Sequence, residues 1–179
     1  EASSVEELEI GLDSKPSLES LKGIGYLTNL ESLKIENQWQ LSSLEGLDGN
    51  LTKLTGLTVS YTSITSIKEV ANMPTLVWAI FQGNAINSLD GIQNLKHLRY
   101  LDIISNQLTS LQGIEGAVNL EEIMAYGNQL TNLNGIENLS RLKKLNIRKN
   151  RLRKLKGIEN LTNLKVLDVA ENKLTAVRE

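Results

Sequence analysis

A 22-residue repeat constrains the fold of this chain more than any other feature of its sequence. Five asparagines, Asn84, Asn106, Asn128, Asn150 and Asn172, stand at intervals of 22 residues. Each closes the same phrase, in which apolar residues occupy positions 1, 4 and 6 and asparagine occupies position 9. A fixed period of this length is typical of a solenoid, in which each repeat forms one coil and stacked coils bury a continuous core.

The spacing of the apolar residues predicts the structure of each coil. Units begin near residues 5, 30, 54, 76, 98, 120, 142 and 164, so the first two units are longer than the rest. Alternation at positions 4 and 6 predicts a short strand. Later apolar residues recur every three positions, which favours a 3₁₀-like or extended return over an α-helix. We therefore predict an α/β solenoid of about eight coils, with a parallel β-sheet on the concave face and short 3₁₀ or extended segments on the convex face.

The repeated asparagine has a physical reason to recur. Its side chain can point inward and bond backbone groups of the turn, which a tight coil would otherwise bury unpaired. Thr62 holds position 9 in the third unit, and the first two units also lack asparagine there. We expect the asparagine ladder to begin at Asn84.

Composition argues against a catalytic or metal-binding protein. The chain has no cysteine and one histidine, His97, so the usual metal clusters and a Ser-His-Asp arrangement cannot be assembled. We expect no enzyme activity, no metal and no cofactor. No apolar run reaches membrane-spanning length. The unbroken repeat favours one domain over residues 1–179. From the incomplete last unit we expect that the chain is excised from a longer one, or that an atypical terminus or a dimer covers the end.

The outward positions of the predicted strands gather the large apolar residues of the middle coils. Positions 3, 5 and 7 should face solvent on the concave sheet. They include Trp78, Ile80, Tyr100, Ile104, Met124 and Tyr126, with Tyr61 at the edge. A contiguous exposed apolar patch marks a partner surface, and Trp and Tyr are enriched at binding hot spots. We predict that these residues bind a protein partner; alternatively, they pack against one another and stabilise the sheet.

Charge is distributed unevenly along the chain. Residues 1–50 carry ten acids and three bases, whereas residues 141–179 carry twelve bases and four acids. The basic run suggests nucleic acid, but its residues spread around the coil and the other half would repel phosphate. We expect a solvated face or an acidic protein partner instead of nucleic acid. Lys144 and Arg148 on the concave face, Lys149, and acidic residues of the early coils should orient that partner.

The repeat phrase resembles a known family. The ten-residue phrase that begins at Leu130, and the one 22 residues later, are similar to the 22-residue class of leucine-rich repeat. The first reads Leu130-Thr-Asn-Leu-Asn-Gly-Ile-Glu-Asn-Leu. That class includes the bacterial internalins and the leucine-rich-repeat regulatory subunit of protein phosphatase one. Glycines stand where internalins usually carry proline: Gly46, Gly91, Gly113, Gly135 and Gly157.

The resemblance implies a curved solenoid whose concave face binds another protein. We expect a monomeric, bacterial, secreted or cell-surface recognition module. Two alternatives remain: a cytoplasmic regulatory scaffold of the phosphatase type, and a carbohydrate-binding surface built from the aromatic residues.

Overall fold

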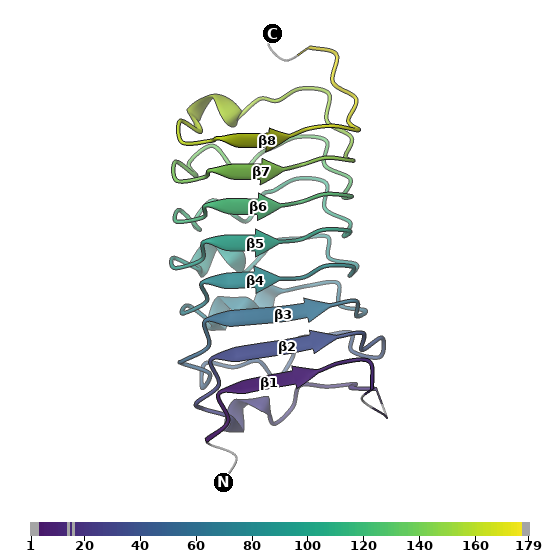
Figure 1. Cartoon of the computed structure of the whole chain (residues 1–179), viewed down its shortest axis with the longest axis vertical. Coiled ribbons are helices and arrows are strands. Elements are labelled where there is room, and N and C mark those ends of the chain that lie inside the picture. Colours follow the sequence, from purple (N-terminus) through teal and green to yellow (C-terminus); the bar gives the residue numbers. More distant parts are fainter. Residues whose placement is uncertain (1–3, 14, 16, 177–179) are drawn as a thin grey trace.

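Each repeat forms one coil of a solenoid. The computed structural model describes residues 4–13, 15 and 17–176. Its eight strands pair in chain order in one parallel sheet (Figure 1). They are β1 (Glu7–Ile10), β2 (Ser32–Glu36), β3 (Gly56–Ser60), β4 (Trp78–Ile80), β5 (Tyr100–Asp102), β6 (Glu122–Met124), β7 (Lys144–Asn146) and β8 (Val166–Asp168). The predicted solenoid with a parallel sheet is confirmed.

Strand register aligns the repeat positions across the sheet. Position 3 forms one row, from Glu7 in β1 to Val166 in β8, and position 5 forms another, from Glu9 to Asp168. Residues at positions 1, 4 and 6 are buried in the second to seventh coils, as Leu98, Leu101 and Ile103 show with 0% exposure, and are partly buried in the first and last coils. The core therefore lies between the sheet and the return segments, because every coil turns the same positions inward.

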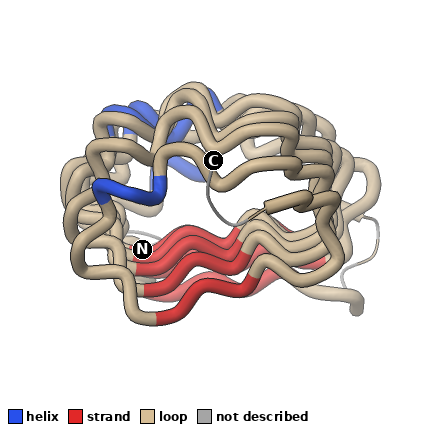
Figure 2. Tube along the Cα trace, turned by 90° about the horizontal axis from the view of Figure 1, so that it is seen from above, coloured by secondary structure: helices blue, strands red, loops and turns tan. Residues whose placement is uncertain are grey.

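The return segments lie opposite the sheet (Figure 2). In the described part of the chain they include the 3₁₀ helices η2 (Ile24–Tyr26), η3 (Lys68–Asn72), η4 (Ile92–Asn94) and η5 (Ile158–Asn160). This confirms the predicted preference for short 3₁₀ or extended returns. No helix among the described residues has the length and apolar character needed to cross a membrane.

Most return segments are preceded by a glycine that the backbone requires, whereas η3 is preceded by Ile67. Gly135 has φ 108° and Gly113 has φ 102°, a region that side chains with a Cβ rarely adopt. A Cβ at Gly135 would also lie 2.5 Å from the carbonyl oxygen of Leu111 in the preceding coil. Glycine is therefore needed both for conformation and for close stacking of the coils.

The position-9 asparagines bond backbone groups, as predicted, and they also join neighbouring coils. Asn106 Nδ2 donates to the carbonyl oxygen of Phe81 in the preceding coil at 2.8 Å and to that of Ile103 in its own coil at 3.1 Å. Its Oδ1 accepts the backbone N–H of Ile86 at 3.0 Å. The bond to the preceding coil recurs at each of the other four asparagines. The ladder satisfies buried backbone groups and fixes the stacking of the coils.

The ladder extends further toward the N-terminus than its asparagines do. Gln38 occupies position 9 of the second coil and is 1% exposed. Its Nε2 donates to the carbonyl oxygen of Gly11 at 2.7 Å, and its Oε1 accepts the N–H of Leu18 at 2.7 Å. The asparagines begin at Asn84 as predicted, but their role begins at Gln38. The asparagine pattern does not predict this role, because at Gln38 a longer amide side chain reaches the same kind of partner across an enlarged coil.

Candidate functional site

The predicted surface residues lie together on the solvent-facing side of the sheet, which we call the strand face. Six of them are partly exposed there, on β4 to β6 or just after these strands: Trp78, Ile80, Tyr100, Ile104, Met124 and Tyr126. Trp78 pairs with Tyr100 in the strand register, and Tyr100 pairs with Glu122. Tyr61 lies at the edge and is 42% exposed. The sheet therefore brings these residues onto adjacent coils of one surface.

Trp78 has a packing role within the strand face. Its indole occupies the space above Gly56 on β3, so a Cβ at Gly56 would overlap the ring. Gly56, Thr58 and Ser60 are buried although their strand borders the solvent-facing side, and Thr58 and Ser60 are only 5% and 1% exposed. Trp78 thus contributes to the stability of the sheet while leaving part of its ring accessible.

Tyr61 is placed by an unusual backbone conformation that recurs through the solenoid. It stands at position 8 with φ 54°, and its ring lies where a side chain on Gly83 would be. The other position-8 residues from the second coil onward share a positive φ: Asn37, Gly83, Ser105, Gly127, Lys149 and Glu171. The left-handed conformation belongs to the turn that follows every strand, so it positions Tyr61 without being special to it.

A buried carboxylate lies at the centre of the strand face. Asp102, at the end of β5, is 3% exposed. Its Oδ2 accepts Gln82 Nε2 at 2.6 Å and the Tyr100 hydroxyl at 3.3 Å, while its Oδ1 accepts the N–H of Ile104 at 3.0 Å. The Tyr61 hydroxyl in turn donates to Gln82 Oε1 at 3.4 Å. These four polar side chains form one hydrogen-bonded chain across three coils.

The electrostatics of Tyr100 reflect this arrangement. Burial of the phenol, together with the negative charges of Asp102 and Glu122, raises the pKa of Tyr100 to about 12. The phenol therefore stays protonated at neutral pH and can donate to Asp102.

Asp102 and Gln82 also occupy outward positions but are polar, so the predicted patch of large apolar residues did not include them. Two signals could have found them. Asp102 interrupts a row in which Ile80 and Met124 are its neighbours, and Gly56 faces Trp78 in the adjacent strand. A lone acid between apolar neighbours indicates a polar network, and a glycine opposite a large ring indicates a seat for that ring.

The basic residues predicted to orient a partner already have partners within the chain. Lys144 lies 3.9 Å from the Glu122 carboxylate, and Arg148 Nε donates to Glu171 Oε1 at 2.9 Å. Lys149 lies over the Tyr126 ring, 5.8 Å from its centroid. The ion pairs are exposed, so a partner could exchange them at little energetic cost.

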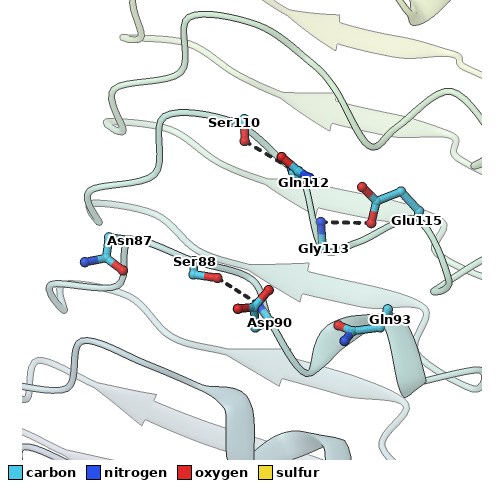
Figure 3. A pocket seen from close by; sticks show the side chains of 8 residues that line it. All are labelled: Asn87, Ser88, Asp90, Gln93, Ser110, Gln112, Gly113 and Glu115. Carbon is cyan, nitrogen blue, oxygen red and sulfur yellow. Dashed lines mark hydrogen bonds between the residues drawn. The ribbon is translucent and has the colours of Figure 1, made fainter.

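A polar cleft of about 390 Å³ lies away from the strand face, between the turns of two neighbouring coils (Figure 3). Its lining comprises Asn87, Ser88, Asp90, Gln93, Ser110, Gln112, Gly113 and Glu115. Several of these groups serve their own turns: Ser88 Oγ accepts the N–H of Asp90, and Glu115 Oε2 accepts that of Gly113. No group of three His, Cys, Asp or Glu suited to a metal occurs among the described residues. The cleft shows no assembled reactive group.

Comparisons with known proteins agree with this geometry. The family described as Leucine Rich repeats (2 copies) matches residues 140–179. An internalin of Listeria monocytogenes, inlF, superposes with a TM-score of 0.75 at 30% identity, covering 87% of this chain and 46% of its own. Internalin C2 of the same species gives 0.70 at 22% identity, covering 94% and 82%. The functional domain of InlJ gives 0.74 at 22%, covering 96% and 34%.

The matched region is smaller than the relatives it resembles. The chain spans less than half the length of inlF, and curated protein sequences contain no match. The family match, the structural similarity and the 22-residue coils nonetheless agree on one architecture. The chain folds as a leucine-rich-repeat solenoid with 22-residue coils, similar in fold to the internalins.

Proposed function

We propose that this leucine-rich-repeat module is non-catalytic and binds a protein partner on the strand face, centred on the coils of β4 to β6. The observation that carries the proposal is a contiguous group of partly exposed apolar and aromatic side chains at positions the repeat leaves free. The proposed anchor is Trp78, Tyr100 and Tyr126, with Ile80, Ile104 and Met124 around it.

The repeat does not require large apolar residues at these positions. At position 3, where Trp78 and Tyr100 stand, other coils carry Glu7, Ser32 and Lys144. The core positions of the middle coils are already filled by buried residues. Large apolar side chains at free positions are what an interface needs, because aromatic residues contribute most of the binding energy at hot spots.

Two of the rings are held in place before any partner arrives. Gly56 provides the seat for the Trp78 indole, and Asp102 accepts the Tyr100 hydroxyl. A side chain that is already ordered loses less conformational entropy on binding. This pre-organisation supports a recognition role for the surface.

A capture experiment tests the proposal. Four proteins would be immobilised: the wild type and three double variants. Two double variants change the strand face, Trp78→Ala with Tyr100→Ala and Tyr126→Ala with Met124→Ala. The third, Tyr26→Ala with Val118→Ala, is a control that removes exposed apolar residues elsewhere. Extracts of candidate host cells would be applied and the retained proteins quantified by mass spectrometry. We expect proteins retained by the wild type and the control to fall at least about tenfold on both strand-face variants.

Folding must be checked separately, because Trp78 covers β3. Circular dichroism and thermal unfolding of each variant would show that the solenoid persists. Equal retention by folded strand-face variants would falsify the proposed binding surface.

We further propose a bacterial cell-surface or secreted location and a monomeric state, by similarity to the internalins. An antibody against the chain should label intact cells of the source organism or detect the protein in culture medium. Detection only after lysis would instead favour a cytoplasmic regulatory scaffold. Light scattering coupled to size exclusion would measure the mass of the particle.

A further inference from the structure

We propose that the strand face accepts a basic side chain of the partner, the guanidinium of arginine or the ammonium of lysine, beside Tyr100 and close to Asp102 and Glu122. This inference rests on the proposed function and specifies the chemistry of the segment that binds there: apolar residues on Trp78 and Ile80, with a cation at their centre.

The first observation that supports a basic partner is the charge of the surface. The outward positions from β3 to β6 contain only two charged residues, Asp102 and Glu122, and both are acidic. Of the basic residues on either side, Lys34 pairs with Glu9 and Glu36 at 2.9 and 3.1 Å, and Arg148 pairs with Glu171. Lys144 lies 3.9 Å from Glu122, in an exposed ion pair that a partner's cation could exchange at little energetic cost. Complementary charge selects partners and fixes their orientation, so this region favours a basic one.

The burial of Asp102 carries the second step. No ion pair between described residues includes Asp102, although it is 3% exposed. Its hydrogen bonds come from neutral donors alone. A carboxylate removed from water is costly unless it is both hydrogen-bonded and paired with an opposite charge. A cation from outside the chain would supply the missing counter-charge.

The turn that follows β5 accounts for the hydrogen bond of only one of the two carboxylate oxygens of Asp102. Oδ1 of Asp102 accepts the N–H two residues on, and Asn146 and Asp168 form the same bond at position 5 of their own coils. Oδ2 differs: it accepts Gln82 and Tyr100, and these side chains cover it. The turn bond is a feature of the repeat, whereas the covered Oδ2 is particular to this place.

The position of Tyr100 carries the third step. Its neighbours in the position-3 row are Trp78 and Glu122, and its hydroxyl reaches Asp102. The raised pKa of the phenol has both carboxylates among its causes, so both act on the same small region. A cation beside the ring would gain from both charges and from the face of the aromatic ring.

Panning a phage-displayed library of random 12-residue peptides tests the inference. The targets would be the wild type and three variants: Asp102→Asn, Trp78→Ala and Glu115→Gln. Asp102→Asn preserves the shape of the side chain, and Glu115→Gln is a control that removes an acid away from the strand face. We expect peptides that depend on Trp78 to contain arginine or lysine beside apolar residues. For one such peptide, Asp102→Asn should weaken binding about tenfold and Glu115→Gln should leave it unchanged.

A double-mutant cycle then places the cation. Replacing the peptide's arginine by the neutral isostere citrulline should weaken binding to the wild type about as much as Asp102→Asn does, with little further loss when both changes are combined. Selection of acidic or uncharged peptides that depend on Trp78, or equal affinity of the citrulline peptide, would overturn the basic-partner inference while leaving the binding surface intact. Selection only of peptides that bind Trp78→Ala as tightly as the wild type would count against the proposed function itself.

Discussion

Two buried polar side chains four residues apart, Asn106 and Asp102, differ in what they bond. Asn106 is 6% exposed, lies inside the turn, and bonds backbone groups only. Asp102 is 3% exposed, lies on the strand face, and bonds two side chains as well as one backbone N–H. The first bonding pattern recurs at Asn128, Asn150 and Asn172, whereas the second occurs at one place among the described residues.

The difference separates the needs of the fold from the features of one surface. From the fourth coil onward each coil presents the same backbone groups to its interior, so asparagine satisfies them each time. The strand face presents only what its own side chains supply. A polar group buried there by non-repeating neighbours is therefore a better indication of function than the repeated asparagine.

The largest expected effect comes from breaking the ladder. Asn106→Ala leaves the N–H of Ile86 and the carbonyl of Phe81 without their side-chain partner, so the free energy of unfolding should fall by about 3 kcal/mol. Urea denaturation followed by circular dichroism measures it. Asn87→Ala, at an exposed asparagine, is the control and should change stability by less than about 0.5 kcal/mol. A loss as small as the control's would mean that the ladder is not essential to coil stacking.

The seat of Trp78 predicts a smaller effect confined to the strand face. Gly56→Ala places a Cβ within the indole, so the ring must move and stability should fall by about 2 kcal/mol. Tryptophan emission in a Trp39→Phe background reports the ring directly, because the chain has only two tryptophans. Gly49→Ala, where a Cβ meets no atom within 4 Å, is the matched control. Unchanged emission in Gly56→Ala would contradict the seat.

The network around Asp102 predicts a pH dependence. The folded-state pKa of Tyr100 is raised from 10.0 to about 12, so the stability associated with it is fully present below pH 10 and is lost as pH rises toward 12. Tyr100→Phe should remove this alkaline loss. The difference in absorbance at 295 nm between wild type and variant should titrate near pH 12, and Asp102→Asn should move that midpoint down. A difference curve centred at pH 10 would disprove the network's effect on Tyr100.

The smallest effect concerns the repeated turn. Ser105 has φ 56° at position 8, where Gly83 and Gly127 stand in the adjacent coils. Ser105→Gly should raise the free energy of unfolding by about 0.5 kcal/mol, because glycine adopts this conformation without steric conflict. Thermal unfolding detects the shift, and Ser110→Gly provides a control outside this turn. A loss of stability would show that Ser105 contributes a contact stronger than its backbone strain.

The amino-acid sequence by itself determined the coil period, the inward positions, the strand register and the inward role of the asparagines. These follow from a local pattern that repeats, because each coil contacts only its neighbours and must bury the same positions. The same pattern predicted which apolar residues would share the strand face.

Only the tertiary structure decided which side chains pack against or hydrogen-bond to one another across neighbouring coils. Gly56 supports Trp78 from the neighbouring coil, Gln38 takes the place of an asparagine in an enlarged coil, and Asp102 is buried because Tyr100 and Gln82 cover it. Such contacts depend on the size and rotamer of side chains about 20 or more residues apart, which no local period encodes. Stacking converts residues that are distant in sequence into one surface.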